Sequence, residues 1–111
     1  MNKTKTALVI IVLLVVLPSA EILRERSNYK SYVLRLEAAS SELRPGASKQ
    51  QVLDRLGQPD FLLGQNIEWH AGKHQGWLRE KLPGHTVKGH YTLAIEFDYQ
   101  NKIVRIWGGI N

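Results

Sequence analysis

The chain has 111 residues, a formal net charge of +5 and no cysteine. Its 43% hydrophobic and 23% charged residues are ordinary for one small globular domain and argue against wholesale disorder. The absence of cysteine excludes disulfides, thiolate catalysis and cysteine metal sites. Without Lys3 and Lys5, 13 basic side chains face 10 acidic ones, and this net charge of +3 is too small to indicate a nucleic-acid partner.

The N-terminal segment, residues 1–23, has the pattern of a membrane anchor or a secretory signal. Lys3 and Lys5 precede an unbroken apolar run over residues 7–17, and Pro18-Ser19-Ala20 follows. A basic start, an apolar run and small residues are typical of a signal peptide. As a helix, residues 4–23 span about 30 Å, the thickness of the hydrocarbon core. We expect either an uncleaved anchor or a cleaved signal, with the lysines cytoplasmic and the remaining chain exported.

Residues 24–42 read as an amphipathic linker helix between this segment and a domain at 43–111. Apolar residues recur at spacings of seven, four, three and seven, which suits one helical face. These residues are Ile22, Tyr29, Val33, Leu36 and Leu43. Charged residues occupy most of the other positions, so we expect this helix to dock on the domain or to serve as a stalk.

Residues 43–60 encode a short helix together with its start and stop signals. Ser48 is a good N-cap, and Gln51, three residues later, completes a capping box. Val52, Leu53 and Leu56 then form an apolar stripe at helical spacing. We expect Gly57 to end the helix in a left-handed conformation, with Pro59 beyond it preventing continuation.

The C-terminal half is predicted to form three strands. Phe61, Leu63, Ile67 and Trp69 alternate along the first, with Gly64 as a bulge or bend between two pieces. Residues 91–97 alternate most clearly, and residues 103–107 return after a turn in which Asn101 tolerates positive φ. Helices followed by a three-stranded antiparallel meander predict an α+β domain.

The sequence LRPGASKQQVLDRLGQPD, residues 43–60, resembles the signature of the SmpA/OmlA (BamE-like) family of bacterial envelope proteins. The matching positions are Leu43, Gly46, Ser48, Val52, Leu56, Gly57 and Pro59. LAIEFDYQNKIVRI, residues 93–106, resembles the closing hairpin of the family. Small modules of the β-lactamase-inhibitor-like fold share the same order of helix and strands.

The resemblance implies a periplasmic domain with a role related to outer-membrane protein assembly or envelope integrity. The characterised members are lipoproteins whose signal ends at a lipidated cysteine. This chain has no cysteine, so a lipid anchor of that kind is excluded.

Residues 71–90 are expected to form a long basic loop, with a short strand near residues 77–82. Its Trp77, Arg79, Lys81 and Lys88 are our candidate partner-binding residues, for a protein or for anionic lipid headgroups. In the alternative interpretation, Trp77 simply covers one end of the sheet.

The four histidines, His70, His74, His85 and His90, lie in or beside this loop, but no recognised metal-ligand or catalytic motif surrounds them. We therefore predict no metal site, no cofactor and no enzyme activity. The sequence favours a non-catalytic envelope module, tethered to the membrane, that binds a protein or lipid partner. The alternative is a metal- or histidine-dependent envelope hydrolase, in which a carboxylate such as Glu68 pairs with His70.

Overall fold

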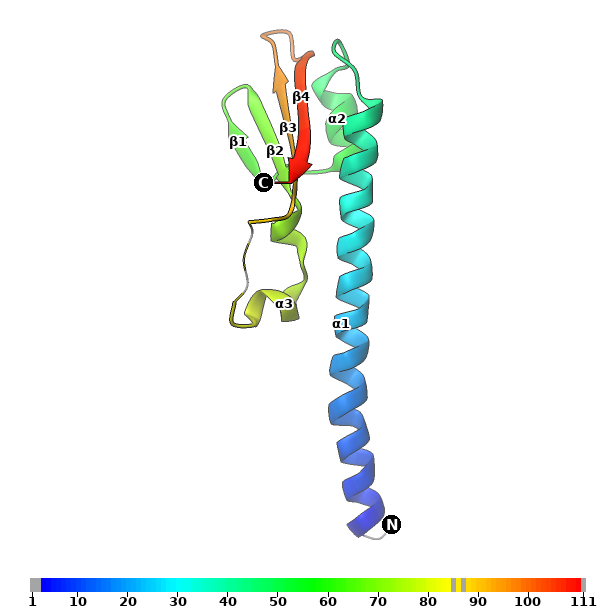
Figure 1. The fold of residues 1–111 in the computed structure, drawn as a ribbon. Coiled ribbons are helices and arrows are strands. Elements are labelled where there is room, and N and C mark those ends of the chain that lie inside the picture. The colour runs from blue at the N-terminus through cyan, green and yellow to red at the C-terminus, as the bar shows by residue number, and fades with distance from the viewer. Residues whose placement is uncertain (1–2, 85, 87, 111) are drawn as a thin grey trace.

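The computed structural model describes residues 3–84, 86 and 88–110, and it consists of a long helix beside an α+β domain (Figure 1). Helix α1 spans Lys3–Glu42, and its 40 residues correspond to about 60 Å. The molecule measures 70 × 25 × 19 Å because the N-terminal half of α1 projects beyond the domain. The predicted α+β class is therefore confirmed.

Helix α1 runs without a break through the described residues of the two predicted N-terminal segments, 1–23 and 24–42. It continues through Pro18, which lacks the N–H of a regular helical hydrogen bond. The apolar side chains from Leu8 to Leu17 are all exposed. The helix is long and apolar enough to cross a membrane, a property that it shares with signal sequences.

The C-terminal half of α1 packs on the domain through one stripe of side chains. Leu36 and Ala39 are fully buried, and Tyr29, Tyr32 and Val33 pack against the same core. Most of the predicted apolar face is therefore confirmed. Ile22 is exposed, because the sheet does not extend that far along the helix.

Helix α2, Lys49–Leu56, has the predicted capping box. The Gln51 N–H donates to Ser48 Oγ at 3.2 Å, and the Ser48 N–H donates to Gln51 Oε1 at 2.9 Å. Val52 and Leu56 are buried as expected. Gly57 has a positive φ of 76°, but its ψ of −162° lies outside the left-handed helical region that we predicted.

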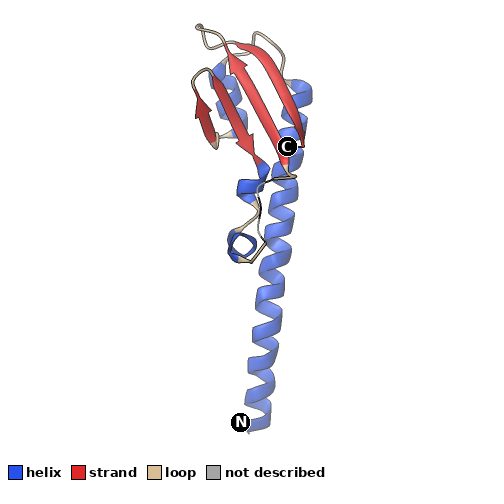
Figure 2. Ribbon diagram, turned by 60° about the vertical axis from the view of Figure 1, so that its left-hand side comes forward, coloured by secondary structure: helices blue, strands red, loops and turns tan. Residues whose placement is uncertain are grey.

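Four strands, rather than the three predicted, form an antiparallel sheet in the order β1-β2-β3-β4 (Figure 2). Their bounds are Phe61–Leu63, Asn66–His70, Tyr91–Phe97 and Ile103–Ile110. The extra strand arises at Gly64, where we predicted a bulge or bend. Leu63 pairs with Asn66, so Gly64 and Gln65 form a two-residue turn, and the φ of +67° at Gly64 suits a hairpin of this kind.

The core lies between one face of the sheet and the two helices. Trp69, Leu93 and Ile95 are buried on that face, against Leu36 of α1 and Val52 of α2. Backbone hydrogen bonds from Gly46 to Ile103 and from Ile103 to Ala47, each 2.8 Å, join the chain before α2 to strand β4. Asn101 has the predicted positive φ, at 60°, in the turn between β3 and β4.

Residues 71–90, here called the arm, extend from the sheet along α1 toward its N-terminus (Figures 1 and 2). The arm contains the short 3-10 helix η1, Ala71–His74, and helix α3, Trp77–Lys81. The strand predicted near residues 77–82 is therefore wrong. His85, one of the four histidines of the sequence, lies outside the described residues.

Candidate functional site

The arm carries all four predicted partner-binding residues. Trp77, Arg79 and Lys81 lie on α3, and Lys88 lies in the segment that returns to β3. The Trp77 side chain is 66% exposed, so the alternative in which it covers the end of the sheet is wrong. Lys81 and Lys88 are exposed, whereas Arg79 is half-buried beside α1.

The buried Glu25 of α1 holds α3 in place. Its Oε1 accepts a hydrogen bond of 2.9 Å from the Leu78 N–H in the first turn of α3. This carboxylate therefore satisfies one of the amide groups that the start of a helix leaves unpaired. A Cβ at Gly76 would approach the Glu25 side chain to 2.5–2.7 Å, so only glycine fits at that contact.

The Glu25 contact fixes the position of α3 along α1. Glu25 follows the last apolar residue of the N-terminal segment, Leu23, by two residues, or about 3 Å of helical rise. Helix α3 therefore lies level with the end of the apolar segment, between that segment and the sheet (Figure 1).

Further polar contacts join the arm to the rest of the molecule. The Tyr29 hydroxyl hydrogen-bonds His90 Nδ1, where the arm returns to the sheet. Burial raises the pKa of Tyr29 above its ordinary value of 10.0, and the nearby Arg79 guanidinium opposes that rise. Within the arm, Gln75 Nε2 donates to the carbonyls of Gly72 and Thr86, each at 2.7 Å.

A groove of about 620 Å³ lies between α1, the arm and the end of β4; we call it the basic groove. It is lined by Ile22, Arg26, Tyr29, Lys30, Val33, Arg79, Leu82, Gly89, His90, Tyr91 and Ile110. Of the side chains that the structure describes, three cations line it and no carboxylate does. Among the described residues, Arg26, Lys30 and Arg79 form no ion pair.

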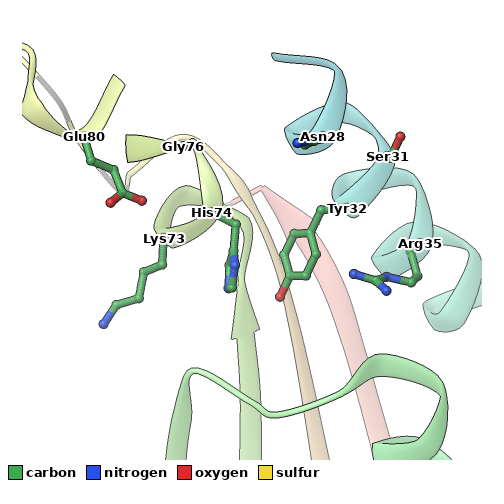
Figure 3. A pocket seen from close by; sticks show the side chains of 8 residues that line it. All are labelled: Asn28, Ser31, Tyr32, Arg35, Lys73, His74, Gly76 and Glu80. Carbon is green, nitrogen blue, oxygen red and sulfur yellow. The ribbon is translucent and has the colours of Figure 1, made fainter. Parts of the chain in front are cut away.

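A second cavity of about 620 Å³ lies between α1 and the arm; we call it the tyrosine pocket (Figure 3). Tyr32 and Arg35 of α1 face His74 of η1 across it. The rings of Tyr32 and His74 are in contact, with centroids 4.2 Å apart and planes tilted by 32°, and the Arg35 guanidinium lies 5.3 Å from the Tyr32 ring centroid.

His74 is paired with a carboxylate at this pocket. Its Nε2 lies 2.8 and 3.0 Å from the two oxygens of Asp60, which also accepts the His70 N–H at 2.8 Å. The Tyr32 hydroxyl is buried without a hydrogen-bond partner among the described residues. Burial raises the pKa of Tyr32 well above its ordinary value, Asp60 adds to the rise, and Arg35 opposes it.

The chemistry available at the tyrosine pocket is limited. A histidine paired with a carboxylate is able to act as a general base. However, the Ser31 hydroxyl points away from His74 in Figure 3, and the hydroxyl beside His74 is that of Tyr32, a phenol whose raised pKa disfavours its ionised form. Within the described part of the chain, no group of three or more His, Asp and Glu side chains is placed to hold a metal ion.

The carboxylate predicted as a partner of His70 is close to it in the structure. Glu68 Oε1 lies 2.7 Å from His70 Nε2, on the face of the sheet opposite the core. Sequence reasoning missed both Glu25 and the pairing of Asp60 with His74. The signal for Glu25 was its place in the buried stripe of α1, four residues before Tyr29 and seven before Tyr32.

No protein-family model matches the chain, and a search of curated proteins finds no match. The resemblance to the SmpA/OmlA family therefore stays a prediction from residues 43–60 and 93–106.

Proposed function

We propose that the protein is a non-catalytic, membrane-tethered module of the cell envelope, whose arm binds a partner at the membrane surface. The observation that supports this proposal most strongly is the continuity of α1. One half of the helix exposes only apolar side chains between residues 8 and 17, and the other half is part of the domain core. A membrane that covers the first half holds the domain at a fixed height above its surface.

The tether is tested by membrane fractionation and N-terminal sequencing of the expressed protein. We expect the chain in the membrane fraction, resistant to alkaline extraction, with the apolar segment, residues 7–17, still present in the mature protein. A soluble chain that begins at Glu21 would contradict the tether and identify the segment as a cleaved signal.

The side of the membrane on which the domain lies is a separate part of the proposal. The resemblance supports the periplasmic side, as does our expectation that Lys3 and Lys5 stay cytoplasmic, whereas the cations after the apolar segment favour the opposite orientation. Arg24, Arg26 and Lys30 follow the apolar segment, against two lysines before it, and positive flanks tend to stay cytoplasmic.

A Tyr99→Cys variant distinguishes the two orientations, because the chain has no other cysteine and Tyr99 is 95% exposed. If the domain is exported, a membrane-impermeant maleimide is expected to label the cysteine at position 99 in cells whose outer membrane has been permeabilised. Labelling only after lysis of the inner membrane would place the domain in the cytoplasm.

The position of the arm favours lipid over protein as the partner. Helix α3 lies at the height where lipid headgroups are expected, and tryptophan is enriched at that depth. Arg79, Lys81 and Lys88 supply positive charge, which attracts anionic headgroups. A role in outer-membrane protein assembly or envelope integrity rests on the resemblance alone.

The arm is tested by affinity capture from native membranes with Trp77→Ala/Lys81→Glu as bait. A matched control is Tyr99→Ala/Lys102→Glu, which makes the same change of charge and also removes an exposed aromatic ring, at the opposite end of the domain. We expect the first variant to lose partners that the wild type and the control retain. Equal recovery by all three baits would exclude the surface of Trp77 and Lys81 as the binding surface.

The second candidate is a histidine-dependent hydrolase, which the pairing of His74 with Asp60 favours. It predicts ester, amide or phosphoester hydrolysis that falls at least 100-fold in His74→Ala, since general-base catalysis contributes about that much. A metal-dependent version also predicts stoichiometric zinc that is lost in His70→Ala or His74→Ala. If the purified chain hydrolyses no model substrate and carries no metal, the non-catalytic proposal is favoured.

A further inference from the structure

We infer that the basic groove holds the phosphomonoester headgroup of a membrane lipid, with Arg26, Lys30 and Arg79 around the phosphate. This inference deepens the proposed function and rests on it, because it names the chemistry that the arm recognises. It assigns a ligand to a groove whose described lining combines three cations with apolar side chains and contains no carboxylate.

The three cations converge from two elements. Arg26 and Lys30 are four residues apart on α1 and therefore lie on the same helical face. Arg79 reaches the groove from α3, which the Glu25 hydrogen bond holds against α1. One guanidinium group is able to bind two phosphate oxygens at once, whereas an ammonium group binds them as a point charge.

The charge of the groove favours a phosphomonoester over a phosphodiester. A phosphate monoester carries a charge of about −1.5 to −2 near neutral pH. A diester carries a single negative charge, which would leave most of the charge of three cations without a counterpart. His90 also lines the groove, but its Nδ1 is hydrogen-bonded to the Tyr29 hydroxyl, so we do not count His90 among the groups that bind the phosphate.

The height of the groove identifies a lipid, rather than free phosphate, as the source of that group. Arg26 lies about 4.5 Å and Lys30 about 10 Å beyond Leu23 along the helix. The headgroup layer occupies about 6 Å on each side of the hydrocarbon core, and long cationic side chains reach along the helix into it.

The remaining lining of the groove suits the upper part of an acyl or isoprenoid chain. Ile22, Val33, Leu82 and Ile110 contribute apolar surface beside the cations. Ile22 belongs to the end of the apolar segment, so the groove is continuous with the surface that faces the membrane interior. A volume of about 620 Å³ is within the range of pockets that hold small ligands.

The experiment uses the full chain in neutral detergent micelles at fixed ionic strength and pH 7.5. Three probes are titrated separately: dioctanoyl phosphatidic acid, dioctanoyl phosphatidylglycerol and inorganic phosphate. Binding is followed by native mass spectrometry. We expect phosphatidic acid to bind at least tenfold more tightly than phosphatidylglycerol, and inorganic phosphate to bind weakest.

The variants separate the groove from general basicity. Arg26→Gln/Arg79→Gln removes two groove cations, whereas Lys81→Gln/Lys88→Gln removes two cations of the arm that do not line the groove. We expect the first pair to lose at least tenfold in affinity for phosphatidic acid and the second pair to stay within twofold of wild type. Arg79→Lys keeps the charge but loses the paired guanidinium contact, so its affinity for phosphatidic acid is expected to lie between those of wild type and Arg26→Gln/Arg79→Gln.

Equal affinity for phosphatidic acid and phosphatidylglycerol would overturn the choice of a phosphomonoester. Equal losses in the two double variants would overturn the groove as the site, and inorganic phosphate binding as tightly as the lipid would overturn a lipid source. These outcomes are independent of the tether. If the chain is cleaved before Glu21 in cells, the proposed membrane tether is wrong, even if the full chain binds phosphatidic acid in micelles.

Discussion

The sheet end of the domain and the arm are held together by different kinds of interaction. At the sheet end, apolar side chains such as Trp69, Leu93 and Val52 are completely buried. Helix α3 of the arm buries no residue completely and is held by a few polar contacts, among them those of Glu25 and Tyr29. Regions with few buried apolar contacts open at lower free energy than the core. The sheet end therefore sets the stability, and the arm is the part that is able to respond to a partner.

The largest effect is expected in the core, for Trp69→Ala. The Trp69 side chain is fully buried, and its Nε1 donates to the Gly57 carbonyl at 3.3 Å. We expect the free energy of unfolding to fall by about 3–5 kcal/mol, because the substitution leaves a large cavity. Thermal unfolding of the full chain in micelles, followed by near-ultraviolet circular dichroism, measures it. A loss below about 1 kcal/mol would place Trp69 outside the core.

A smaller and local effect is expected for Gly76→Ala at the base of α3. The new Cβ meets the Glu25 side chain, and the φ of +106° at this position is strained for any residue except glycine. We expect a cost of about 1–3 kcal/mol. Hydrogen exchange is expected to show it as lost protection in the arm, with the amides of β2 and β3 unchanged. Equal losses in the sheet would mean that the arm and the core unfold together.

At the junction of the two regions, Tyr32→Phe is expected to change the response to pH more than the stability at neutral pH. The substitution removes a buried hydroxyl without a partner among the described residues, so the change at pH 7 stays within about 1 kcal/mol.

The direction of the pH effect follows from the raised pKa of Tyr32. The fold favours the neutral phenol, so its contribution is complete below the unfolded pKa near 10 and is lost as the pH rises toward the folded pKa. Wild type is therefore expected to lose stability above pH 10 more steeply than Tyr32→Phe. Denaturant unfolding at pH 7, 10 and 11 measures this, with Tyr99→Phe in the exposed β3–β4 turn as control. Equal pH slopes for wild type and Tyr32→Phe would contradict the burial of this hydroxyl.

The smallest effect on stability is expected for Trp77→Ala. Trp77 is 66% exposed on α3, so its loss is expected to change the free energy of unfolding by less than about 0.5 kcal/mol. Binding to vesicles that contain anionic lipid is expected to weaken at the same time. A change of stability comparable to that of Trp69→Ala would show that the arm belongs to the core.

Sequence reasoning succeeded where the determining residues are close together in the chain. The capping box of Ser48 and Gln51 and the positive φ of Asn101 depend on neighbours within a few residues, and both were predicted. The apolar stripe of α1 was predicted because its period extends over several turns. The α+β class follows from these local patterns.

The errors occurred where local patterns are ambiguous or the deciding contact is distant. A glycine within an alternating run predicts a bulge as readily as a turn, so the hairpin at Gly64 was missed. Helix α3 has only five residues, too few for a helical period to be recognised. Its position depends on Glu25, which is 53 residues before the Leu78 amide that it binds, and no local pattern connects the two.

The central claim is that α1 holds the arm at the headgroup layer and the far end of the domain in water. The most direct test is a spin label on a single cysteine at Leu82→Cys or Tyr99→Cys, in the full chain reconstituted into lipid bilayers. Relaxation by a water-soluble nickel chelate and by oxygen gives the depth of each label. We predict that the label at position 82 lies within about 6 Å of the hydrocarbon boundary and that the label at position 99 lies in bulk water. Equal accessibility of both labels to the nickel chelate would contradict the account.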